Sequence, residues 1–130
     1  MALKLIIDTD PGIDDAMAIF YAIAAPEIDL LGLTTVFGNV TTPKATRNAL
    51  YLLEQAGIEI PVAEGLHRPR VLPAFPPSSA VHGAEGFGTL TVPAPRRREL
   101  AETAPEYLVR MAREHRGELV LCPIGPLTNI

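Results

Sequence analysis

The chain is poor in cysteine, in positive charge and in long apolar stretches. Its one cysteine, Cys122, cannot form an internal disulfide, and its place in the apolar run that starts at Leu119 predicts a buried small hydrophobic residue rather than a nucleophile. The 11 basic residues stand against 15 acidic ones, which leaves a net charge of −4. That balance gives no electrostatic attraction to nucleic acid or to an anionic membrane surface.

We expect these residues to contain neither a membrane-spanning helix nor a signal peptide. No apolar run reaches the length of about 18 residues that a membrane-spanning helix needs. The segment from Met1 to Ile7 leads straight into a charged motif, without the basic, apolar and cleavable zones of a signal peptide. We therefore expect no nucleic-acid partner, no membrane partner and a cytoplasmic location. With 130 residues, of which 48% are apolar and 20% charged, the chain has the composition of one globular domain.

Short apolar runs alternate with helical patterns along the chain. Strands are expected at residues 3–8, 28–36, 60–63 and 118–122, and helices at 13–24, from Thr42 to Gly57 and from Thr103 to Gly117. Thr42 is expected to be an N-cap before a proline at the first helical position, and Thr103 to form a capping box with Glu106. The expected buried stripes of the last two helices are Ala49, Leu50 and Leu53, and Leu108, Met111 and Ala112.

Strands that alternate with helices predict an α/β fold. A parallel connection needs a crossover that returns over the sheet, so the expected architecture is an open, mostly parallel sheet with helices on both faces. One connection is unusually long, from Gly65 to about Arg98, and contains six prolines. A connection of that length is typically functional or mobile. Its last three residues, Arg96 to Arg98, are expected to form a solvated edge rather than a phosphate clamp.

Four carboxylates follow the first strand within eight residues: Asp8, Asp10, Asp14 and Asp15. Two such charges about 4 Å apart repel by roughly 4 kcal/mol at an effective dielectric near 20. Acids in a first helical turn are common, so Asp14 and Asp15 alone would indicate only a helix start. All four beside a Pro-Gly turn predict a metal site. With no His or Cys cluster nearby, these oxygen ligands suit calcium or magnesium rather than zinc.

Polar segments follow three of the expected strands. The aspartates come after the first strand, residues 37–39 after the second and the string PIGPLTN, residues 123–129, after the last. Ligands in open α/β sheets collect beyond the carboxyl ends of the strands. We therefore expect these three turns to meet at one edge of the sheet.

The segments DTDPGIDDAMAI, TTVFGNV, HGAEGFG and GPLTNI resemble the inosine-uridine preferring nucleoside hydrolase family, in the same order and at similar separations. The resemblance implies the Rossmann-like fold of that family. It also implies calcium-dependent hydrolysis of the N-glycosidic bond of ribonucleosides to ribose and free base. Ca²⁺ would be the cofactor, a small-molecule ribonucleoside the substrate, and a homo-oligomer the assembly. An uncharged nucleoside agrees with the absence of a phosphate-binding glycine loop.

The same resemblance implies roles for the residues around the metal. Asp10 and Asp15 would bind calcium, and Asp10 would be the catalytic residue that takes the proton of a bound water. The backbone carbonyl of Thr128 would be a further ligand of the ion. Asp8 would not bind the ion itself but would support the residues that do. Glycosidic cleavage passes through an oxocarbenium-like state, which agrees with carboxylates close to the reacting sugar.

On the substrate side, the resemblance implies that Asp14 and Asn39 hold the ribose and that His82, in the HGAEGFG loop, lies near the base. This loop departs from the family at two positions. Glu85 and Phe87 stand where the family usually has Asp and Leu, so the loop packs differently. We expect base preference to depend on that difference.

Family members are more than twice as long, and their later segment supplies another calcium-binding aspartate, further ribose contacts and a histidine for the leaving group. Residues 1–130 are thus expected to be the N-terminal portion of a single domain, with 65–98 as a Pro-rich active-site loop; the chain would be a piece, a shortened relative or half of a split protein. Two alternatives remain open. One is a truncated paralogue that binds a nucleoside or a partner without catalysis. The other is a magnesium-dependent haloacid dehalogenase-like phosphatase, although Gly12 stands where that class needs Thr or Val.

Overall fold

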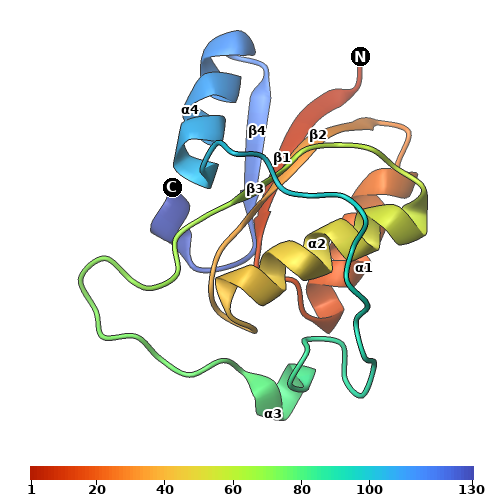
Figure 1. Cartoon of the computed structure of the whole chain (residues 1–130). Coiled ribbons are helices and arrows are strands. Elements are labelled where there is room, and N and C mark those ends of the chain that lie inside the picture. Colours follow the sequence, from red (N-terminus) through yellow and green to blue (C-terminus); the bar gives the residue numbers. More distant parts are fainter.

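The computed structural model describes residues 1–130. Figure 1 shows one sheet of four parallel strands in the order β3-β2-β1-β4. The strands are β1 (Leu3–Thr9), β2 (Ile28–Thr35), β3 (Val62–Glu64) and β4 (Leu119–Pro123). The helices are α1 (Ile13–Ala24), α2 (Thr42–Ala56), α3 (Ser79–His82) and α4 (Ala104–Glu114), and a 3-10 turn, η1, spans Leu127–Asn129. The predicted open parallel α/β sheet is confirmed.

The two faces of the sheet bury separate apolar clusters. Side chains alternate along β1, so Leu5 and Ile7 pack toward α1 and α2, whereas Ile6 packs toward α4. The first cluster includes Leu53 of α2, and the second includes Tyr107 of α4, both with no exposed surface. Helices therefore cover both faces, as the sequence predicts.

Helix α2 shows one correction. The N-cap is Thr41, and Thr42 is already helical, because the Thr42 hydroxyl donates a hydrogen bond to the Leu66 carbonyl at 2.8 Å instead of capping the helix. Gly57 ends the helix in a left-handed conformation, as expected. The expected stripe of Ala49, Leu50 and Leu53 is buried.

Helix α4 keeps its predicted capping box. The Glu106 carboxylate accepts hydrogen bonds from the Thr103 amide at 2.9 Å and from the Thr103 hydroxyl at 2.7 Å. The helix ends at Glu114, before the expected stop at Gly117. Ala112 was expected in the buried stripe and is exposed, because it lines an open pocket with Leu108 and with Leu121 of β4 instead of packing in the core.

Strand β4 lies at the edge of the sheet and pairs only with β1. The expectation of a buried Cys122 is therefore wrong: its side chain is half-buried, since no strand lies on its other side. Strand β3 begins at Val62, two residues later than expected, because Val62 is the first residue to pair with Leu33 of β2. The other strand ends fall within a residue or two of the predictions.

The chain between β3 and α4 runs outside the sheet, and α3 is its one helix (Figure 1). At its end Arg96 and Arg98 are exposed, as expected for a solvated edge. Arg97 is half-buried, and its guanidinium donates to the carbonyls of Ile58 and Ile60, both at 3.3 Å. None of the helices is long and apolar enough to cross a membrane.

Candidate active site

The three polar turns meet at the carboxyl edge of the sheet, as the sequence predicts. The Asn39 amide, after β2, donates to the Asp10 carboxylate at 2.6 Å. The Asn129 side chain, in η1 after β4, donates to the Asp8 carboxylate at 2.8 Å. Asp8, Asp10 and Asp15 are buried, with exposed fractions of 1%, 4% and 3%.

Three hydrogen-bond donors from this chain bind the Asp15 carboxylate. The Thr9 hydroxyl donates to Oδ1 at 2.7 Å. The Gly12 amide at 3.2 Å and the Asn39 side-chain amide at 3.0 Å donate to Oδ2. A carboxylate has about four lone-pair positions, so one remains for a further ligand. Asn39 therefore orients Asp15 and Asp10 together.

Asp10 is held differently. Its Oδ2 accepts the Asn39 amide, whereas its Oδ1 is buried and has no hydrogen-bond partner. The backbone of Gly38 passes so close that a Cβ there would lie 1.9 Å from Oδ2, which explains the glycine. The structure thus aims one carboxylate oxygen at a place where this chain supplies no donor.

Burial raises the pKa of Asp10 to about 7. The hydrogen bond from the Asn39 amide opposes that shift, and the nearby charges of Asp15 and Asp14 add to it. A positive charge beside Oδ1 would favour the ionised form.

Asp8 lies behind the other acids at the end of β1. The Thr34 hydroxyl donates to its Oδ1 at 2.5 Å, together with Asn129, while its Oδ2 is buried without a partner. Burial raises the pKa of Asp8, and the hydrogen bonds from Thr34 and Asn129 oppose the shift. Asn129 also donates to the Thr35 carbonyl at 2.9 Å and accepts the Leu66 amide at 3.0 Å. Its linking role was not anticipated from sequence, although the position after β4 is a signal that could have found it.

His82 and Asp14 come together at the start of α1. The Ile13 amide donates to Nδ1 of His82 at 3.2 Å, and Oδ1 of Asp14 lies 3.8 Å from the same nitrogen. The His82 side chain is 12% exposed and that of Asp14 is 81% exposed. These two of the three sequence-predicted substrate residues therefore lie next to the buried acids, and Asp14 faces solvent.

Thr128 lies half-buried in η1. No hydrogen bond joins it to the aspartates, so its expected role through the backbone carbonyl stays a prediction. No group of three or more His, Cys, Asp or Glu side chains is gathered to hold a metal ion. The buried, unpartnered oxygens of Asp8 and Asp10 nevertheless fit an oxygen-binding cation. Since calcium takes 6–8 oxygen ligands, the residues of this chain fit as part of such a site.

A cavity of about 380 Å³ opens beside Gly38, between the start of α2 and the long connection. Phe37 and Phe75 pack edge to face at its wall, with ring centroids 5.4 Å apart. Ligand pockets are typically concave and mostly apolar with a few polar groups. Gly38 lines this cavity and also lies against Asp10, so the cavity adjoins the acidic cluster, although none of the buried acids lines it.

An open parallel sheet whose carboxyl edge carries buried acids and a neighbouring cavity defines a class of α/β proteins that bind ligands at that edge. Comparison with known proteins then identifies the group. The chain belongs to the inosine-uridine preferring nucleoside hydrolase family, whose family model matches residues 5–130.

Individual relatives agree with this assignment. The chain is 51% identical to "Probable uridine nucleosidase 2" of Arabidopsis thaliana, over 98% of this chain and 40% of that protein. The solved plant nucleoside hydrolase PpNRh1 is 47% identical, with a TM-score of 0.90 over 99% of this chain and 41% of that one. The purine-preferring ribonucleoside hydrolase of Gardnerella vaginalis is 35% identical, with a TM-score of 0.92 over 97% and 41%. The chain therefore spans about two fifths of the length of these relatives.

Proposed function

We propose that this protein is a calcium-dependent ribonucleoside hydrolase and that residues 1–130 form the N-terminal portion of its single catalytic domain. One observation carries the proposal: the buried Oδ1 of Asp10 has no hydrogen-bond partner. This oxygen lies in an acidic cluster, and the chain belongs to the nucleoside hydrolase family. Leaving a buried carboxylate oxygen unpaired is costly unless something binds it. A calcium ion is the ligand that this set of oxygen donors suits.

In the proposed reaction, Asp10 accepts a proton from the water that attacks the anomeric carbon of the ribose. The N-glycosidic bond breaks, and the base leaves with its electron pair and takes up a proton. Asp10 and Asp15 would hold the calcium ion together with the carbonyl of Thr128. When bound, calcium orients a water molecule and makes it more acidic. The carboxylates of this cluster also favour the positive charge that develops on the ribose.

The remaining residues would bind the nucleoside. Asp14 is the solvent-facing acid next to the cluster, and its carboxylate suits hydrogen bonds from ribose hydroxyls. Asn39 already links Asp10 and Asp15 and lies where the sugar would meet them. His82 would meet the base, with residues 65–98 as the loop that borders the site. The free edge of β4 suits pairing with a further segment of the domain or with another chain. We also propose a homo-oligomer, which the family resemblance implies.

A reducing-sugar assay with inosine and uridine tests the proposal, with and without a calcium chelator. We expect hydrolysis by the wild-type protein, loss of hydrolysis with the chelator and recovery when calcium is added back. Asp10→Asn should lower kcat by about 10²–10⁴-fold. Asp29→Asn is the matched control, because it removes the same charge from an exposed position near the start of β2. The aspartate cluster lies at the opposite end of that strand.

Hydrolysis that survives both the chelator and Asp10→Asn would contradict the mechanism. Nucleoside binding without turnover would favour the non-catalytic paralogue instead. Release of phosphate from a phosphomonoester, lost in Asp8→Asn, would favour the phosphatase alternative.

A further inference from the structure

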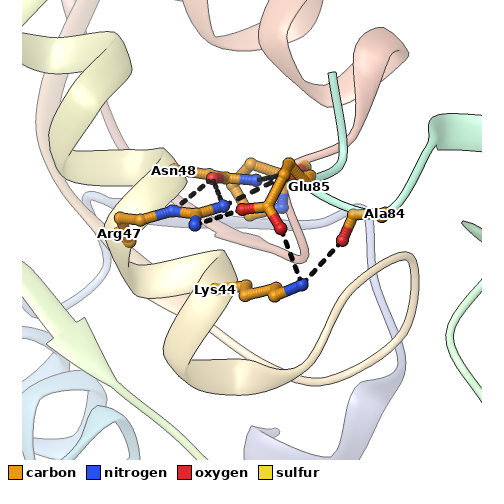
Figure 2. Close-up of polar contacts among 6 residues, drawn as sticks. Lys44, Arg47, Asn48, Ala84 and Glu85 are labelled. Carbon is orange, nitrogen blue, oxygen red and sulfur yellow. Dashed lines mark hydrogen bonds and ion pairs between the residues drawn. The ribbon is translucent and has the colours of Figure 1, made fainter. Parts of the chain in front are cut away.

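Three side chains from one face of α2 bind the loop that follows α3. Lys44, Arg47 and Asn48 are spaced three and four residues apart and converge on Glu85, as Figure 2 shows. Lys44 Nζ donates to the Glu85 carboxylate at 2.9 Å and to the Ala84 carbonyl at 2.8 Å. Arg47 forms an ion pair with the other Glu85 carboxylate oxygen. These hydrogen bonds, first from Lys44 and then from Arg47, hold the pKa of Glu85 below its usual range.

Asn48 connects this loop to the turn that follows Asp10. Its side chain is fully buried, and its Nδ2 donates to the Pro11 carbonyl at 3.0 Å and to the Glu85 carbonyl at 2.8 Å. Its Oδ1 accepts hydrogen bonds from Arg47 Nε at 3.2 Å and Nη2 at 2.9 Å. Both hydrogens and the oxygen of the carboxamide are therefore used, and the two carbonyls that they join lie 74 residues apart in the sequence.

The loop fits against the turn closely. A Cβ at Gly86 would lie 2.7 Å from Asn48 Nδ2 and 2.9 Å from the Pro11 carbonyl oxygen, and the residue has a φ of 94°. Any other residue there would push the loop away from the turn. At the start of the same loop, His82 receives the Ile13 amide through Nδ1. The contact at Asn48 and the contact at His82 thus hold the loop at two points.

We propose that Asn48 is a positioning residue for nucleoside binding, which holds the Glu85 and Pro11 carbonyls together and so keeps the His82 ring beside the aspartate turn. The inference rests on the proposed function, because it takes that turn to be the nucleoside site. Since Nδ1 of His82 accepts a hydrogen bond, the neutral ring carries its proton on Nε2. Asn48 thereby fixes which ring nitrogen is left to meet a ligand.

The first test does not depend on catalysis. Nitrogen-15 spectra of the histidine rings report the tautomer, and a His82→Ala variant assigns the His82 signals among the three histidines. Asn48→Asp keeps the side-chain shape and removes both donors. We expect the wild-type protein to show His82 protonated on Nε2, and Asn48→Asp to show a mixture of both tautomers. Arg110→Ala, which breaks the two surface ion pairs of Arg110 with Glu102 and Glu114, is the control and should match the wild type.

Asn48→Ala serves as the second variant, because it removes both donors to the Pro11 and Glu85 carbonyls without adding a buried charge. It should shift the His82 signals in the same direction as Asn48→Asp. If Asn48→Asp does not fold, the spectra of Asn48→Ala test the proposal. His82 signals that stay at their wild-type positions in every folded variant would overturn the proposal, whether or not the protein hydrolyses nucleosides.

The second test separates positioning from general stability. Asn48→Asp should raise KM for the nucleoside by about tenfold while kcat changes by less than about threefold, since the displaced group contacts substrate. In a His82→Ala background the same substitution should have no further effect on KM. Additive effects of the two substitutions would overturn the proposal. If the wild-type protein hydrolyses no nucleoside, that result contradicts the proposed function alone. The histidine spectra would still test the role of Asn48.

Discussion

The two sides of the aspartate cluster differ in how many of their polar atoms have hydrogen-bond partners within this chain. On the α1 and α2 side, Asp15 has three hydrogen-bond donors, and Asn48 uses every polar atom of its side chain. On the β4 side, Asp8 and Asp10 each keep a buried oxygen without a partner. The strand beside them has a free edge, and Val120 is exposed. The difference agrees with the proposal that a cation and further ligands complete the second side, whereas the donors of this chain already serve the first.

The largest expected difference between the two sides concerns apolar packing. Leu53→Ala removes a fully buried side chain from the α2 face and should lower the free energy of unfolding by about 2–5 kcal/mol. Leu121→Ala, in half-buried β4, should cost about 1 kcal/mol, because it loses less buried area. Denaturant unfolding of both variants measures the two values. Equal losses would show that the β4 side is as tightly packed as the other.

The hydrogen bonds of Asp15 give a smaller expected effect. Thr9→Val keeps the shape of the side chain but removes the hydroxyl that donates to Oδ1 of Asp15. We expect a loss of about 1–3 kcal/mol in the free energy of unfolding, since a buried carboxylate oxygen loses its donor. Thermal unfolding with and without calcium measures it. A stability unchanged from the wild type would mean that Asp15 does not depend on donors from this chain.

The smallest expected effect is the pH dependence of the contact at Glu85. Its pKa in the folded protein is lowered by Lys44 and Arg47, so its contribution to stability is present above the pKa of the unfolded chain. That contribution is lost as the pH falls through the lower, folded pKa. Lys44→Ala should raise the Glu85 pKa toward its ordinary value, as measured by a carbon-13 titration of the carboxyl groups. A Glu85 titration that Lys44→Ala leaves unchanged would contradict the ion pair.

Local features of the sequence predicted the fold because strands and helices here follow short-range signals. The capping box of Thr103 and the left-handed conformation of Gly57 each depend on residues only a few positions away. The meeting of Asp10 with Asn39 could also be predicted, since it follows from the rule that parallel strands bring their carboxyl ends to one edge.

Contacts between distant segments could not be predicted in this way. Asn129 bonds Asp8 across 121 positions of the chain, and Asn48 bonds residues on two separate loops. Each lies in a segment whose local pattern suggests only a helix or a turn. The half-burial of Cys122 was missed for a related reason: an apolar run does not reveal that its strand lies at the edge of the sheet.

Calcium binding measured by titration calorimetry tests the central claim most directly. The unpartnered oxygen of Asp10 is taken to be a ligand for the ion, so the wild-type protein and Asp29→Asn should bind calcium with equal affinity. Asp10→Asn should bind at least about tenfold more weakly, a loss of about 1.4 kcal/mol or more. Equal calcium affinity in Asp10→Asn and the wild type, or no calcium binding by the wild-type protein, would contradict the account.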